Sequence, residues 1–194
     1  MLTSTLIRRH INSIPVGTLF STRDFLHYGL RSTVDHLMWF LVKTEQIMRV
    51  ARGIFVKPGT GNFKMPTAME IAAAKAKAFG KEIYTHGRDA AYDMDLEESG
   101  NSDLVFTVNG RSTSFDTIHG RVYFSGTNSK AVKKANNPVA LIVRALKYFD
   151  VEPTKAVIAK ILNPLGRTQR NDLKQDVKWM PAWISDPFVR FWYL

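Results

Sequence analysis

The chain of 194 residues contains no cysteine, which excludes disulfide bonds, thiol nucleophiles and cysteine-ligated zinc or iron–sulfur sites. It also lacks an apolar run of the ~18 residues that suggest a membrane-spanning helix. No apolar core and cleavage site follow Arg8 and Arg9, so no signal peptide is expected. These absences predict a cytoplasmic protein without a membrane partner.

Acidic residues are few compared with basic ones. Asp and Glu number 17 against 27 Lys and Arg, and the formal net charge is +10. Such an excess favours a polyanionic partner, but charge alone does not distinguish DNA, RNA, an acidic membrane surface and an acidic protein. Basic residues dominate residues 1–58 more strongly than the remainder. The charge distribution therefore favours the N-terminal quarter as the part that binds a polyanionic partner.

The residues that carry catalysis or bind metals are not arranged in recognisable patterns. None of the five histidines stands at a ligand spacing such as HxxxH, so no metal site is predicted. Asp93, Asp95, Glu97 and Glu98 could hold Mg²⁺, but a solvated acidic loop is favoured because no catalytic Lys or His stands at a matching distance. We therefore predict no enzyme and no cofactor.

The stretch from Ser32 to Pro58 has the pattern of a helix followed by a basic hairpin. Ser32 is predicted to cap the helix, with Asp35 closing a capping box. Four apolar residues then follow at helical spacing: Val34, Leu37, Met38 and Leu41. Two apolar runs, 47–50 and 54–57, are separated only by Ala51-Arg52-Gly53, where glycine favours a tight turn. A helix before a basic hairpin is the order of a recognition helix and its wing.

The preceding residues complete the same motif. A helix is predicted over 3–13, an extended segment over 17–20, and a second helix over 22–27 that Ser21 caps and Asp24 completes as a box. Residues 1–58 thus predict a winged helix-turn-helix. The stretch 59–66, between two prolines, is predicted to be a linker before a second domain over 67–194.

The second domain is predicted to be mixed. Thr67 and Glu70 form a capping box at the start of an alanine-rich helix. Strand-like segments at 104–108, 112–118 and 122–125, with turns between them, predict an antiparallel meander. Helices are expected over 139–149 and from Pro153, and 167–178 is expected to be the last. The fold class is therefore α+β: an N-terminal winged helix-turn-helix, then a mixed domain with a small antiparallel sheet and C-terminal helices.

The chain resembles the AbiEi-like antitoxins of bacterial type IV toxin–antitoxin and abortive-infection systems. The matching motifs stand in order along nearly all of it: 49–55, Pro66-Thr67 with 70–72, His86-Gly87 with Ala90-Ala91, Thr107, Gly110, 145–147 and Pro181-Ala182-Trp183. The resemblance implies a transcriptional repressor that binds operator DNA, often inverted repeats, and autoregulates its operon. It also implies a cognate nucleotidyltransferase-like toxin, which the antitoxin need not bind physically.

The predicted DNA contacts come from the second helix, the recognition helix and the wing. They are Ser21, Thr22, Arg23, Arg31, Ser32, Thr33, His36, Lys43, Arg49, Arg52 and Lys57. A second basic cluster, Lys130, Lys133 and Lys134, either extends the DNA track, binds an acidic protein or forms a solvated loop.

A second hypothesis belongs to another class of protein. The resembled family carries small or basic residues where Trp39 and Phe40 stand, so base readout through the middle of this helix is in question. The alternative is a protein-interaction module whose winged helix no longer reads DNA. The sequence leaves the oligomeric state and the operator open.

Overall fold

The computed structural model describes residues 3–61, 63–98, 104–128 and 138–193. The chain has an α+β fold, and its strands follow one another in a seven-stranded sheet in the order β1-β3-β2-β6-β7-β5-β4. Two compact units divide the chain: Met1–Glu82 with Thr113–Tyr123, and Ile83–Ser112 with Phe124–Leu194. None of the helices in the described ranges combines the length and apolarity that crossing a bilayer requires.

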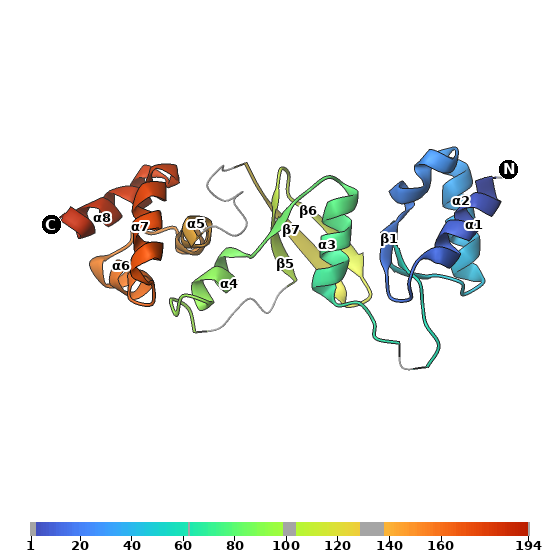
Figure 1. Ribbon diagram of the computed structural model, residues 1–194, viewed down its shortest axis with the longest axis horizontal. Helices are drawn as coiled ribbons and strands as arrows, with labels where there is room; N and C mark the ends of the chain where they lie inside the picture. Colours follow the sequence, from blue (N-terminus) through green and yellow to red (C-terminus); the bar gives the residue numbers. More distant parts are fainter. Residues whose placement is uncertain (1–2, 62, 99–103, 129–137, 194) are drawn as a thin grey trace. The chain divides into compact units, whose positions relative to one another are not determined.

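The first unit begins with α1 (Thr3–Ser13), β1 (Leu19–Ser21), the 3₁₀ helix η1 (Thr22–Tyr28) and α2 (Arg31–Lys43). Figure 1 shows α1 and α2 together beside β1, in blue. They share a buried apolar cluster that includes Ile7, Phe25, Val34, Met38, Leu41 and Phe55. The predicted apolar stripe of α2 is therefore confirmed, because all four of its members are buried.

The predicted cap of α2 is wrong. The helix begins at Arg31, one residue before Ser32, and the carbonyl of Leu30 accepts the N–H of Val34 at 3.0 Å. The Asp35 carboxylate does not return to a cap; it accepts a hydrogen bond from Nε of Arg31 at 2.9 Å. The Asp35 carboxylate, which a capping box would need, is thus bound instead to an arginine one helical turn away.

The hairpin after α2 is confirmed. It consists of β2 (Met48–Ala51) and β3 (Ile54–Val56), and Gly53 supplies the positive φ of the turn, 76°. On one side β3 pairs antiparallel with β1. On the other side β2 pairs with β6 (Thr113–Thr117) at Ala51 and Thr117, and the N–H of Ile118 donates to the carbonyl of Val50 at 3.1 Å. The hairpin therefore does not end the sheet.

Helix α3 (Ala68–Ala78) begins at the predicted capping box. The N–H of Thr67 donates to the Glu70 carboxylate at 2.7 Å, and the N–H of Glu70 donates to the Thr67 hydroxyl at 3.2 Å. Ile71 of α3 is fully buried in a cluster with residues of the hairpin: Val50, Ala51, Ile54 and Val56. Helix α3 thus covers the hairpin, although it follows the predicted linker.

The three predicted strands are present, but they do not follow one another in the order of the predicted antiparallel meander. Besides β6, the strands are β4 (Ile83–Tyr84), β5 (Val105–Asn109) and β7 (Gly120–Thr127), and β5 neighbours β7 and β4, not β6. The N–H of Gly110 donates to the carbonyl of Thr127 at 3.0 Å, and the N–H of Gly126 donates to Oγ of Ser112 at 2.9 Å. Turn residues between strands indicate where the chain reverses, but they do not determine which strands pair.

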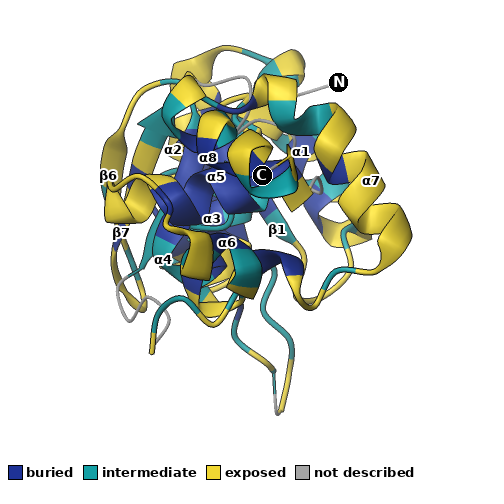
Figure 2. Ribbon diagram, turned by 90° about the vertical axis from the view of Figure 1, so that its left-hand side faces the viewer, coloured by how far each residue is buried: buried dark blue, intermediate teal, exposed yellow. Residues whose placement is uncertain are grey.

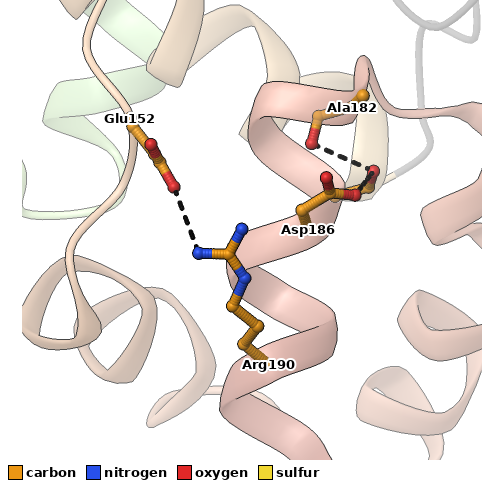
Figure 3. Close-up of polar contacts among 5 residues, drawn as sticks. Glu152, Ala182, Asp186 and Arg190 are labelled. Atoms are coloured by element: carbon orange, nitrogen blue, oxygen red, sulfur yellow. Dashed lines mark hydrogen bonds and ion pairs between the residues drawn. The ribbon is translucent and has the colours of Figure 1, made fainter.

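The second unit contains α4 (Gly87–Tyr92), α5 (Pro138–Phe149), α6 (Lys155–Leu162), α7 (Arg167–Asp176), a short 3₁₀ helix η2 (Val177–Trp179) and α8 (Ala182–Tyr193). Figure 2 shows α5 buried along most of its length and α7 largely exposed. The expectation that 167–178 is the last helix is wrong, because α8 follows and buries Ile184 and Phe188 completely. On the surface of α8, Nη1 of Arg190 lies 3.9 Å from Oε1 of Glu152, and Oγ of Ser185 donates to the carbonyl of Ala182 (Figure 3).

Candidate nucleic-acid interface

A groove of about 270 Å³ lies between α2 and the β2–β3 hairpin, and we call it the α2–hairpin groove. Helix α2 contributes Arg31, Asp35 and Trp39 to its lining, and the hairpin contributes Arg49 and Arg52. Four of the predicted DNA-binding residues line it: Thr22, Arg31, Arg49 and Arg52. The groove is thus bordered by cations from two elements.

The three arginines of the groove are held differently. Arg31 pairs with Asp35, but both side chains are about half exposed, at 62% and 49%. Such a surface pair contributes only ~0–1 kcal/mol, so a phosphate can replace the carboxylate at little cost. Within the described parts of the chain, the side chains of Arg49 and Arg52 have neither a hydrogen bond nor an ion pair, and both are exposed. Their charges are therefore open to an anion.

The outer side of α2 is exposed. Ser32, Thr33, His36 and Lys43 all lie on it, outside the lining of the α2–hairpin groove. The Trp39 side chain is 58% exposed; the His36 ring stacks beside it at 5.8 Å, and the Lys43 ammonium lies 5.1 Å from its centroid. The helix thus presents a polar and aromatic surface.

Phe40 is also exposed, at 39%, and the Arg8 guanidinium of α1 lies 5.2 Å from its ring centroid. Trp39 and Phe40 therefore face solvent within the described structure. This exposure is the feature that the protein-interaction hypothesis requires, and it is equally compatible with a helix that enters a DNA groove.

The residues at the start of η1, Ser21 and Thr22, are less exposed than the outer side of α2. Ser21 and Thr22 are buried, at 4% and 5% exposure, and the N–H of Thr22 donates to the carbonyl of Gly53 at 3.2 Å. The Asp24 carboxylate accepts the N–H of Ser21 at 2.8 Å, so this half of the predicted box is present. Arg23 is exposed, and its guanidinium lies 4.4 Å from the Phe79 ring centroid. Among these three residues, only Arg23 presents its side chain outward.

Lys57 has a structural role. Its ammonium donates to the carbonyls of Asn12 and Ile14, each at 2.7 Å, and so satisfies the last carbonyls of α1. The predicted DNA contact of Lys57 is not tested by this geometry, but its charge is already engaged. The second basic cluster, Lys130, Lys133 and Lys134, lies outside the described residues.

Lys75 of α3 is a cation that sequence reasoning missed. Its ammonium donates to the carbonyl of Arg52 at 2.5 Å and lies 4.9 Å from the Phe79 centroid and 5.4 Å from that of Phe115. Burial lowers the pKa of Lys75, and the nearby charges of Arg52, Arg49 and Arg23 lower it further. Nothing local in an alanine-rich helix signals this role, because the contact arises only in the folded structure.

The described residues contain no group of three or more His, Asp or Glu side chains able to hold a metal ion.

Comparison with known proteins supplies a family for the chain. No curated protein and no solved structure matches it. A family model described as a family of unknown function, DUF6088, matches residues 6–173, which is most of the sequence. The chain therefore belongs to the DUF6088 family.

Proposed function

We propose that the protein is a DNA-binding transcriptional repressor that acts as the antitoxin of a type IV-like toxin–antitoxin system and autoregulates its operon. In this proposal residues 1–58 act as a winged helix-turn-helix, with α2 as recognition helix and the β2–β3 hairpin as wing. The observation that supports the DNA-binding part is the α2–hairpin groove. Arg31, Arg49 and Arg52 line it together, beside the exposed face of α2.

The proposed mechanism divides the contacts by chemistry. The first two turns of α2 enter the major groove, where exposed Ser32, Thr33 and His36 reach base edges. Arg49 and Arg52 contact phosphates or the minor groove beside it, and Lys43 reaches the backbone from the end of α2. Phosphate contacts position the protein, and base contacts select the operator.

Titration of the purified protein with duplex DNA from upstream of its own gene tests the binding. If about five to seven phosphates are contacted, the plot of log affinity against log salt has a slope near −0.9 for each of them. Arg52→Ala should weaken binding to the operator and to a scrambled duplex alike, whereas His36→Ala should change the preference between them. A nearly salt-independent affinity would contradict the phosphate contacts. Equal losses on both duplexes for His36→Ala would contradict base reading by His36.

The antitoxin part rests on the resemblance in sequence and on no contact in the structure. Its test is co-expression with a nucleotidyltransferase encoded by the neighbouring gene, where the antitoxin should restore growth. A pull-down performed in parallel separates neutralisation by binding from neutralisation without a complex. Persistent toxicity at matched expression would overturn this part and leave DNA binding intact.

A second candidate function, a protein-interaction module, is favoured by the exposure of Trp39 and Phe40 on α2. Titration of the wild type, Trp39→Ala and Phe40→Ala with duplex DNA distinguishes the two. Under the repressor proposal both variants keep the steep salt dependence of duplex binding, because neither removes a charge. Under the alternative, the wild type does not bind duplex DNA at all.

A further inference from the structure

A second groove lies on the other flank of the β2–β3 hairpin, between β2 and β6. This β2–β6 groove has a volume of about 440 Å³, and Arg49, Arg52, Ser114, Phe115, Asp116 and Thr117 contribute to its lining. Arg49 and Arg52 line both grooves, so they form a ridge between them. The hairpin arginines therefore have an open surface on either side.

Two further cations border the β2–β6 groove. Arg121 of β7 donates from Nη2 to Oγ of Ser114 at 3.0 Å, and its side chain is exposed. Lys75 of α3 reaches the groove from its other border, since its ammonium contacts the carbonyl of Arg52 and lies above the ring of Phe115. The sequence did not predict either residue, because the contacts of Lys75 with Arg52 and of Arg121 with Ser114 arise only in the folded structure.

The charge balance of this groove is strongly positive. Among the described residues, Arg49 and Arg52 line it, Lys75 and Arg121 contact residues of its lining, and Asp116 is the one carboxylate in that lining. Burial is the main cause of the lowered pKa of Lys75, and the neighbouring arginines, Arg52, Arg49 and Arg23, lower that pKa further. Like charges held together without compensation raise the free energy of the folded state, and an anion in the groove relieves that cost.

We propose that the β2–β6 groove binds the phosphate backbone of the same DNA duplex and extends the interface from the hairpin onto β6 and β7. This inference rests on the proposed function, because it requires a duplex on the hairpin. Arg121 and Arg52 contact successive phosphates, and the Ser114 hydroxyl, which accepts from Arg121, orients the guanidinium. Lys75 is a positioning residue, which holds the backbone of the turn that carries Arg52.

The test uses the full-length protein and two exposed positions. Arg121→Gln removes the border cation, and Ser114→Asp places a carboxylate within the groove. Each should make the log–log salt slope shallower by about 0.9 and lower the affinity at 0.05 M salt by up to about fifteen-fold, as the loss of one phosphate contact requires. Operator and scrambled duplexes should be affected equally, because the backbone carries no sequence information.

Arg9→Gln is the matched control. Arg9 is exposed on α1, lies in neither groove lining, and its loss changes the net charge by the same amount as Arg121→Gln. Thermal unfolding of each variant verifies that it folds.

The outcomes separate the two proposals. If the wild type binds duplex DNA with a steep salt slope, but Arg121→Gln and Ser114→Asp behave like Arg9→Gln, the extended interface is refuted and the proposed function stands. If the two variants instead alter the preference between operator and scrambled duplex, a backbone contact is also refuted. If the wild type binds no duplex, both proposals fail.

Discussion

Basic side chains of the hairpin region serve different purposes, although they look alike in the sequence. Lys57 donates to two carbonyls at the end of α1, whereas Arg52 offers an exposed side chain while its carbonyl accepts from Lys75. Sequence reasoning assigned both to DNA, because a basic residue in a hairpin carries the same local signal in either case. Only the neighbours brought in by folding distinguish them.

Lys57→Met should lower the free energy of unfolding by about 1 to 2 kcal/mol, because it leaves two carbonyls of α1 without their charged donor. The salt slope of DNA binding should stay unchanged. Urea denaturation measures the first quantity and a salt titration of affinity the second. Arg52→Ala is the reciprocal control, with unchanged stability and a shallower slope. A shallower slope for Lys57→Met would show that its ammonium also contacts phosphate.

Gly87→Ala should destabilise the protein by about 1 to 3 kcal/mol, although alanine is the better helix former. A Cβ at this position of α4 would lie 2.6 Å from the carbonyl oxygen of Arg144 and 2.9 Å from Cβ of Tyr148, both on α5. Thermal or urea unfolding checks this, and a variant as stable as the wild type would show that α4 and α5 can move apart cheaply.

At the scale of elements, local signals predicted most of what was found. The bounds of α1, the hairpin turn at Gly53 and the Thr67–Glu70 box are confirmed, since each depends on residues within a few positions of one another. The same box pattern failed at Ser32 and Asp35, because Arg31 is also near enough to take the carboxylate. A motif predicts a contact only when no other partner competes for it.

Elements that depend on distant partners were missed. Helix α8 contains Pro187 and many aromatic residues, which disfavour a helix locally, yet Phe188 is fully buried in the core of the second unit. The strand order β6-β7-β5 likewise depends on pairing between separated segments. Of the candidate interface, the helix and hairpin cations were predictable, while Lys75 and Arg121 required the tertiary structure.

The stability of the protein should depend on pH through His86, which caps the start of helix α4. Nδ1 of His86 accepts the N–H of Arg88 at 3.3 Å, which requires that this nitrogen be unprotonated, and burial lowers the pKa of His86 below 6.5. The unfolded state therefore binds the proton more readily, so the free energy of unfolding should fall as the pH drops below 6.5 through this window.

His86→Asn keeps an acceptor at the cap but removes the titration. The difference in unfolding free energy between wild type and this variant, measured between about pH 5 and pH 8, isolates the contribution of His86 from that of other histidines. The wild type should lose stability relative to the variant toward acid. Parallel curves would contradict the assigned role.

At the scale of the whole molecule, the first compact unit is discontinuous in sequence. Its hairpin packs against α3 and pairs with β6, both of which lie beyond the expected linker at 59–66. The predicted boundary concerns which segments fold independently, and it stays a prediction. The packing of Ile71 against Val50, Ile54 and Val56 nevertheless indicates how a shortened chain should behave.

A fragment of residues 1–58 should unfold at a lower temperature than the corresponding part of the full chain, because it exposes the apolar side of the hairpin and leaves the edge of β2 that faces β6 unpaired. Circular dichroism and sedimentation of the fragment measure its stability and its tendency to associate. The fragment 1–82, which restores α3, is the control and should recover part of the loss. A fully stable, monomeric 1–58 fragment would support the predicted boundary instead.

The pairing of Ala51 with Thr117 has a consequence for biosynthesis, since the two residues stand 66 positions apart. A ribosome adding roughly 5 to 20 residues per second needs about 3 to 13 s to polymerise that interval. Throughout that delay the nascent hairpin displays an uncovered edge to its surroundings, and such edges recruit other chains. Charged Arg49 and Arg52 at this margin repel a second nascent copy, so the features proposed to attract nucleic acid would also guard the polypeptide while it is being made.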